Sequence, residues 1–71
     1  MSKADEMFEK ISYSKYEDLS KIHYFNKNNE KIIINKNTKE FYKESFKFED
    51  YISMQELQAI NKKCEELGWI K

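Results

Sequence analysis

One histidine and one cysteine are the residues of this chain best suited to nucleophilic or metal chemistry. A thiol–imidazole pair could act as a nucleophile if the fold brought His23 and Cys64 together in an open cleft. His23 has no second histidine or cysteine near it in the sequence, so a zinc site would lack ligands. Cys64 falls on the apolar side of a predicted helix, where a thiol behaves as a small hydrophobic group. We therefore expect no metal site and no catalytic pair here.

Acidic residues occur as adjacent pairs, and paired carboxylates could supply a general acid and a general base. The pairs are Asp5-Glu6, Glu17-Asp18, Glu49-Asp50 and Glu65-Glu66. Adjacent acids on a helix point in different directions, and none of the four pairs lies in a recognisable pocket. A glycine-rich phosphate loop is also excluded, because the chain has a single glycine, Gly68. We predict no catalytic residues, no cofactor and no enzymatic activity.

Lysines and aromatic residues are the remaining groups that could bind a partner. All thirteen basic residues are lysines, so the bidentate recognition of phosphate or carboxylate that arginine provides is missing. Residues 21–47 hold seven lysines and three acids, whereas residues 1–20 and 48–71 each hold three lysines and five acids. The middle of the chain is therefore basic and rich in aromatic residues, and both ends are acidic.

Helical spacing marks both ends of the chain. Over residues 3–11 the apolar residues recur at intervals of three and four, with Ser2 placed as the N-cap. Ser53 and Glu56 match a capping box, flanked by Ile52 and Leu57 as a hydrophobic staple. The apolar face of this second helix is predicted to contain Leu57, Ile60, Cys64 and Leu67. Gly68 fits the left-handed position that ends a helix, and Trp69 is placed to pack back on the last turn.

Between the helices the pattern changes to the two-residue period of strands. Residues 12–18 are interpreted as a connection, and strands are predicted over residues 19–25, 30–35 and 39–46. The asparagine-rich loop at 26–29 and the turn at 36–38 are short enough for hairpins. The prediction is a single α+β domain over residues 1–71, of order α-β-β-β-α. A three-stranded antiparallel meander carries the C-terminal amphipathic helix on one face.

The strand period divides the meander into two faces. If Ile22, Tyr24, Ile32 and Ile34 face the helices, then the opposite face receives His23, Phe25 and Ile33. The third strand adds either Phe41 or Tyr42, with Phe46 or Phe48 as an extension. The candidate binding residues are therefore His23, Phe25, Ile33, Tyr42 and Phe46 together with Lys21, Lys31 and Lys43. The competing interpretation is that these aromatic residues fill the core and the lysines only keep the strands soluble.

Size and cysteine content limit the function further. A chain of 71 residues and 8.7 kDa needs most of its apolar groups for its own core, so an internal ligand pocket is not expected. One cysteine excludes an internal disulfide, which favours a reducing cytoplasm. No apolar run is long enough to cross a membrane, and no targeting segment is recognisable.

Both ends of the chain resemble a known group of proteins. The segment from Ser53 to Trp69, SMQELQAINKKCEELGW, and the opening segment from Ala4 to Ile11, ADEMFEKI, are similar to the ends of short uncharacterised proteins of phages and prophages of low-GC Gram-positive bacteria. The similarity covers about a third of the chain and is weaker in the strands. It implies a phage or mobile-element context and brings no known activity or functional residues.

Two functions follow from these observations as hypotheses. The first is a non-enzymatic accessory protein that acts by binding another protein of the host or phage, with self-association into a homodimer through the sheet as a further possibility. The alternative is weak binding of single-stranded nucleic acid, in which lysines neutralise phosphates and aromatic rings stack on bases. The lysines for that role are Lys21, Lys31, Lys39, Lys43 and Lys47.

Overall fold

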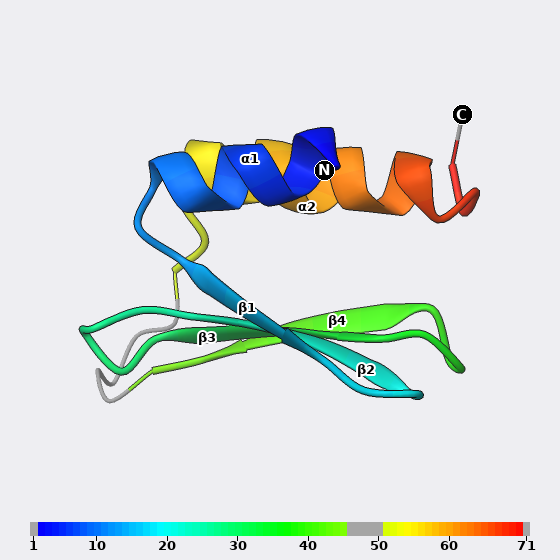
Figure 1. The fold of residues 1–71 in the computed structure, drawn as a ribbon, viewed down its shortest axis with the longest axis horizontal. Coiled ribbons are helices and arrows are strands. Elements are labelled where there is room, and N and C mark those ends of the chain that lie inside the picture. The colour runs from blue at the N-terminus through cyan, green and yellow to red at the C-terminus, as the bar shows by residue number, and fades with distance from the viewer. Residues whose placement is uncertain (1, 46–50, 71) are drawn as a thin grey trace.

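Two helices and four strands make up the fold in the computed structural model, which describes residues 2–45 and 51–70. The elements are α1 (Lys3–Lys10), β1 (Ser14–Glu17), β2 (Lys21–Phe25), β3 (Lys31–Asn35), β4 (Glu40–Glu44) and α2 (Met54–Glu66). The strands form one antiparallel sheet in the order β1-β2-β3-β4 (Figure 1). This confirms the predicted α+β class.

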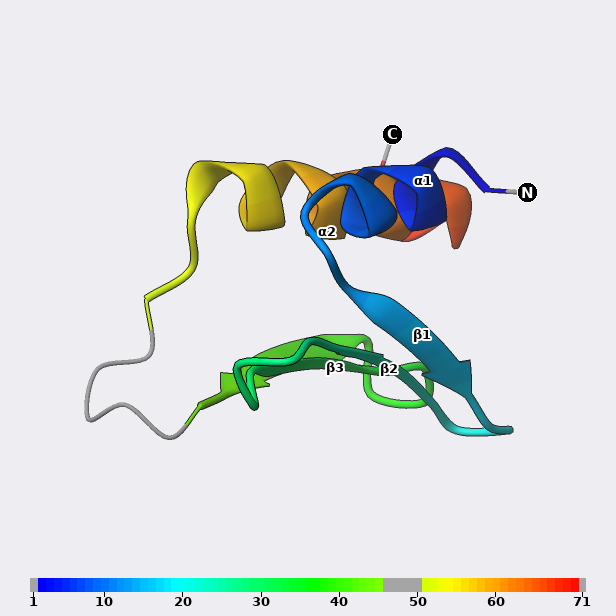
Figure 2. The ribbon, with the colours of Figure 1, turned by 60° about the vertical axis from the view of Figure 1, so that its left-hand side comes forward.

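The helices and the sheet form two layers. Both helices lie on the same side of the sheet in both views, and α1 runs alongside α2 (Figures 1 and 2). The other side of the sheet carries no helix among the described elements. Successive side chains of a strand point to opposite sides of the sheet, so the two-residue period assigns every strand residue to an inner or an outer face.

The prediction of three strands was wrong by one. Residues 14–17 form the edge strand β1, which pairs with β2 in the register Tyr16↔His23. All four residues of β1 are exposed. Residues 12–18 accordingly show no alternation of apolar and polar side chains that could have predicted a strand. A strand at the edge of a sheet can form from such residues because backbone hydrogen bonds to the neighbouring strand hold it.

The ends of the helices follow the predicted capping chemistry. The Ser2 hydroxyl accepts a hydrogen bond from the Asp5 N–H. The capping box of α2 is complete, since Ser53 and Glu56 each accept the other's backbone N–H. At the other end Gly68 has a φ of +79°. The N–H groups of Gly68 and Trp69 donate to the carbonyls of Glu65 and Cys64, the pair of bonds that defines a Schellman motif.

The predicted apolar face of α2 is rotated slightly from the observed one. Ile60 is buried as expected, and Cys64 and Leu67 are partly buried against the core, but Leu57 is 43% exposed. The buried positions of this helix include two charged residues, Glu56 and Lys63. Glu56 pairs with Lys43 of β4, and Lys63 pairs with Asp5 of α1. Because α2 turns these two charged side chains inward, Leu57 lies on its exposed side.

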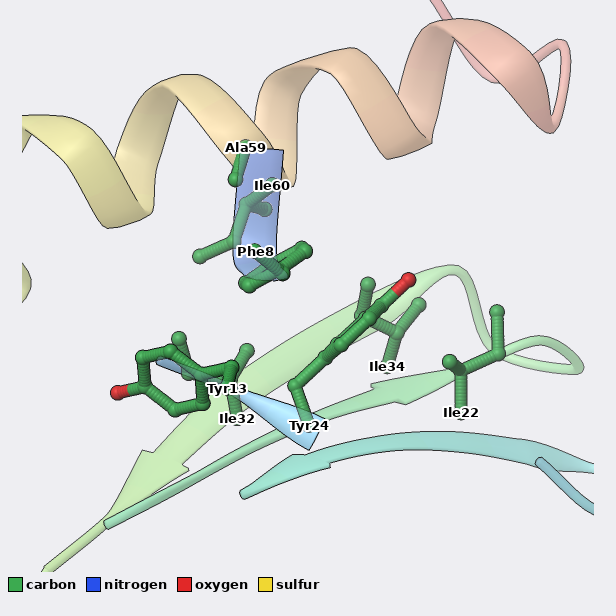
Figure 3. Packing of buried hydrophobic residues seen from close by; sticks show 8 residues of the cluster. All are labelled: Phe8, Tyr13, Ile22, Tyr24, Ile32, Ile34, Ala59 and Ile60. Atoms are coloured by element: carbon green, nitrogen blue, oxygen red, sulfur yellow. The ribbon is translucent and has the colours of Figure 1, made fainter. Parts of the chain in front are cut away.

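The core lies between the layers and is dominated by aromatic and β-branched side chains (Figure 3). The ring of Phe8 from α1 stacks on Tyr24 of β2 at a centroid distance of 3.7 Å, and meets Tyr13 edge-on at 5.8 Å. The rest of the cluster is Ile22, Ile32, Ile34, Ala59 and Ile60. The four predicted inward residues, Ile22, Tyr24, Ile32 and Ile34, are all fully buried, which confirms the inner face.

The asparagines of the loop at 26–29 close the predicted β2–β3 hairpin. Asn29 has a left-handed φ of +61°. The Asn26 side-chain carbonyl accepts hydrogen bonds from the N–H groups of Asn28 and Glu30. This closure fixes the register of the two central strands, and it thereby fixes which residues of β2 and β3 point away from the helices.

In the described ranges, neither helix combines the length and the apolar character that crossing a membrane requires.

Candidate binding face

The candidate site is the side of the sheet that faces away from the helices. The strand pairing assigns to this outer face Ser14 and Tyr16 of β1, Lys21, His23 and Phe25 of β2, Lys31, Ile33 and Asn35 of β3, and Glu40, Tyr42 and Glu44 of β4. It therefore brings together the predicted residues His23, Phe25, Ile33, Tyr42, Lys21 and Lys31. The alternative of Phe41 is settled by the register, since Phe41 lies opposite Ile34 on the inner face.

A row of apolar and aromatic side chains crosses the middle of this face. The register aligns Tyr16, His23, Ile33 and Tyr42 across all four strands. Ile33 is only 5% exposed although neither of the described helices covers it, whereas Tyr16 and Tyr42 at the two ends are 59% and 45% exposed. The row is thus an apolar centre between two accessible phenol rings, on a backbone held by three strand pairings.

The part of the face near β1 is slightly hollow. Tyr16, His23, Phe25 and Lys31 line a surface depression of about 360 Å³. The rings of Tyr16 and His23 contact each other at a centroid distance of 5.5 Å. The imidazole Nε2 of His23 also lies 3.6 Å from a carboxylate oxygen of Asp18 in the β1–β2 turn. A flat apolar group fits such a depression better than an extended polar one.

Charges on the outer face are balanced. Lys21 and Lys31 lie on the two central strands, and Glu40 and Glu44 lie on the edge strand β4. Glu44 is the direct cross-strand neighbour of Lys31. The face is therefore basic towards its middle and acidic along one edge, although residues 21–47 as a whole carry an excess of lysine.

The prediction that Lys43 belongs to this face was wrong. Because Tyr42 points outward, the two-residue period turns Lys43 inward, and its side chain is only 6% exposed. Its ammonium lies 3.0 Å from Glu56, 3.3 Å from Glu30 and 2.6 Å from the Tyr51 carbonyl oxygen. Lys43 is a structural cation between the layers.

Three other predicted residues do not contribute to the described face. Phe46 and Lys47 lie outside the described residues. Lys39 is in the β3–β4 turn, where its backbone is left-handed with a φ of +59°. Of the five lysines proposed to contact phosphates, the described outer face therefore holds Lys21 and Lys31.

The surroundings of Lys43 form a polar junction that the sequence analysis missed. We use the name Lys43 junction for Tyr13, Glu30, Lys43 and Glu56, which come from four separate segments. The Tyr13 hydroxyl donates to the Glu56 carboxylate. Burial raises the pKa of Glu56, but the bonds from Ser53, Tyr13 and Lys43 outweigh it and lower that pKa overall. The shifts in pKa keep both Lys43 and Glu56 charged in this junction.

A second polar cluster joins α1 to the sheet and to α2. The Asp5 carboxylate accepts hydrogen bonds from Lys15 at 2.8 Å, from the Tyr24 hydroxyl at 2.7 Å and from Lys63 at 3.4 Å. Glu66 accepts the Ala4 N–H at 2.9 Å. Burial raises the pKa of Asp5, but these partners outweigh it and hold the pKa at about 2.

The low pKa of Asp5 predicts acid-sensitive docking of α1. Because the folded-state pKa lies below the ordinary value of 3.8, the stabilisation is complete only above about pH 5 and is lost as the pH falls through 2. We expect the urea midpoint to fall over this range in the native chain and to fall less steeply in Asp5→Asn. Urea titrations at pH 7, 4 and 2.5 measure this. If the urea midpoints of the two proteins fell equally with pH, Asp5 would not be the source of the acid sensitivity.

The residues tested first in the sequence do not form one site. His23 lies on the outer face, whereas Cys64 lies on α2 and packs against the core on the inner side, so the sheet separates them. Burial raises the pKa of the Cys64 thiol, which disfavours the reactive thiolate. Within residues 2–45 and 51–70, no three histidine, cysteine or acidic side chains gather closely enough to hold a metal ion.

Tyr16 is the outer-face residue that sequence reasoning missed. Its signal was weak because its strand contains no apolar alternation, and Tyr13 and Tyr16 resembled aromatic residues of a loop. The register places it beside His23 at the edge of the depression. The resulting face offers aromatic contacts with balanced charge. Comparisons of the chain with models of known families, with curated proteins and with solved structures give no match.

Proposed function

We propose that the chain is a small non-catalytic protein that acts by binding another protein through the outer face of its sheet. The observation that carries the proposal is the central row, in which the exposed rings of Tyr16 and Tyr42 stand on either side of the covered Ile33. Phe25 adds a third exposed ring beside the depression. Aromatic anchors around a desolvated centre are the usual energetic core of protein interfaces.

The charge pattern favours a protein partner over a polyanion. Lys21 and Lys31 call for an acidic group on the partner, while Glu40 and Glu44 call for a basic one. A protein surface with an apolar centre and both kinds of charge at its rim satisfies this pattern. A nucleic acid backbone would gain from the two lysines but would be repelled by the two glutamates, so the outer face supports that alternative less well.

The setting of this function is also a proposal. The similarity of the end segments to short phage and prophage proteins supports a role as an accessory protein of a mobile element. The single cysteine supports action in a reducing cytoplasm. The partner would then be a host or phage protein of the same compartment.

Site-specific crosslinking tests the proposal. A benzoylphenylalanine replaces Tyr42 on the outer face or, as a matched control of similar exposure, Leu57 on α2. Each protein is incubated with lysate of a low-GC Gram-positive bacterium, with and without nuclease. We expect one nuclease-resistant protein adduct from position 42, reduced about tenfold or more by Phe25→Ser, because losing an exposed aromatic anchor costs roughly 2 kcal/mol.

The other outcomes contradict the proposal in different ways. Equal adducts from positions 42 and 57, or no dependence on Phe25, would show that the outer face is not the binding surface. An adduct lost on nuclease treatment would favour the nucleic-acid alternative. The absence of any adduct would overturn protein binding through this face.

A further inference from the structure

The free edge of β1 is the feature that carries a further inference. β1 has one strand neighbour among the described elements, β2, and all four of its residues are exposed. The chain contains no proline that could block the edge. An unpaired strand edge offers a row of backbone donors and acceptors to another strand.

The hydrogen-bond pattern tells which peptide groups of β1 point outward. The Asp18 N–H donates to the Lys21 carbonyl, so these two residues form a hydrogen-bonded pair at the end of the β1–β2 ladder. Such pairs alternate along an antiparallel ladder, and the register therefore assigns Tyr16↔His23 to the same type. The N–H and C=O groups of the intervening residues, Lys15 and Glu17, point away from β2 towards the free edge.

This spacing makes the edge complementary to itself. When two antiparallel copies of β1 are centred on Tyr16, Lys15 of each copy lies opposite Glu17 of the other copy. Those are the residues with outward-facing peptide groups, so backbone bonding selects this register. Lys15 and Glu17 already form ion pairs within the monomer, with Asp5, Lys36 and each other, and the register adds an opposite charge from the second copy to that network. Tyr16 then faces its own copy in the closely spaced, non-hydrogen-bonded position, where aromatic pairs interact best. Centring on Lys15 instead would place two lysines opposite each other.

The other edge of the sheet does not share this property. The Asn26 N–H donates to the Glu30 carbonyl, which fixes the alternation of hydrogen-bonded pairs between β2 and β3. Continued across β3 to β4, this alternation turns the peptide groups of Phe41 and Lys43 towards the free edge of β4. Two copies of β4 centred on Tyr42 would place Glu40 opposite Glu44 at both ends, and like charges directly opposite destabilise a pair. The acidic side chains of β4 therefore disfavour self-pairing there.

From these observations we propose that the partner of the β1 edge is a second copy of this chain, joined through antiparallel β1–β1 pairing centred on Tyr16. The two four-stranded sheets become one of eight strands with a two-fold axis beside Tyr16. The formal charge of zero imposes no overall repulsion between the copies. The proposal does not rest on the protein-binding function, since it uses the strand edge and leaves the outer face open.

The dimer also changes what the outer face can contact. The two central rows become collinear, because Tyr16 is the end of the row in each copy and lies at the axis. The depression lined by Tyr16, His23, Phe25 and Lys31 is duplicated next to its own image. The surface offered to a partner is then twofold symmetric and about twice as large.

Sedimentation equilibrium on charge variants tests the pairing. We expect the wild-type mass to rise from 8.7 kDa towards twice that value with a dissociation constant on the order of 100 µM, because a four-residue edge buries little surface. Lys15→Glu and Glu17→Lys each place like charges opposite and are expected to weaken association about tenfold. An equimolar mixture restores both opposite pairs and is expected to form a heterodimer. Glu65→Lys on α2 makes the same change of charge as Glu17→Lys and serves as its control.

Amide exchange keeps the test valid if a variant fails to fold. In the wild-type protein the amides of Lys15 and Glu17 are expected to become protected as concentration rises, while the Asp18 amide, bonded within the monomer, stays protected throughout. A mass of 8.7 kDa at all concentrations up to about 1 mM would overturn the proposal. Association without protection of Lys15 and Glu17, or association of the variants equal to wild type, would also overturn it.

Discussion

Replacing Glu56 with alanine is expected to lower the free energy of unfolding by about 3–5 kcal/mol, because it leaves a buried lysine without its nearest counter-ion. Lys43 and Glu56 are 6% and 8% exposed at their side chains. The same carboxylate accepts the Tyr13 hydroxyl and the Ser53 N–H, so the substitution also removes a buried partner and half of the capping box. A chain of this size has little stability to lose, and we expect it to be largely unfolded. The loss of unfolding free energy is measured by urea titration, with Trp69 fluorescence as the signal.

Two further variants separate the ion pair from the general effect of substitution. Glu65→Ala, on the exposed side of the same helix, is expected to change the free energy of unfolding by about 0.5 kcal/mol or less. Lys43→Met combined with Glu56→Leu is expected to recover part of the loss, since apolar residues can replace a buried ion pair without leaving a lone charge. A loss below about 1 kcal/mol for Glu56→Ala would contradict the role assigned to the Lys43 junction.

Replacing Phe8 with alanine is expected to cost about 3–5 kcal/mol, because the cavity would open where α1 meets the sheet. Phe8 is 1% exposed and contacts two other rings, stacking on Tyr24 and meeting Tyr13 edge-on. α1 has eight residues and is too short to be stable without packing. We expect loss of α1 first and of the whole fold at slightly higher urea, as measured by far-UV circular dichroism.

Two further substitutions are the controls for Phe8→Ala. Phe8→Leu retains most of the apolar volume and is expected to cost about 1–2 kcal/mol. Leu19→Ala removes a side chain that is 99% exposed and is expected to leave the urea midpoint unchanged. If Phe8→Ala and Leu19→Ala had similar midpoints, the core could not be organised around the stacked rings.

The helix ends and the inner face of the sheet could be predicted because their signals are local. The capping box at Ser53, the left-handed Gly68 and the β-branched run around Ile33 each specify their backbone within a few residues. The same two-residue period placed Phe25 and His23 on the outer face. These predictions needed no knowledge of distant contacts.

The predictions that failed depend on residues far apart in the chain. β1 forms because β2 offers it a ladder of hydrogen bonds, which no pattern within residues 14–17 reveals. Lys43 was placed on a basic surface because charge was counted along the sequence, whereas its counter-ions come from the β2–β3 hairpin and from α2. The exposure of Leu57 has the same origin, since α2 turns its charged residues towards partners that only the tertiary structure supplies.

The bond between the Ala4 N–H and Glu66 joins residues 62 positions apart, and Asp5 meets Lys63 over a similar span. Closing so long a loop is entropically costly and slow compared with forming a hairpin. During synthesis on a ribosome the three hairpins can pair early, but their apolar side stays bare until α2 emerges. α1 is synthesised before α2 and therefore completes its packing only when α2 has followed, and in that interval the nascent chain is most prone to misassociation.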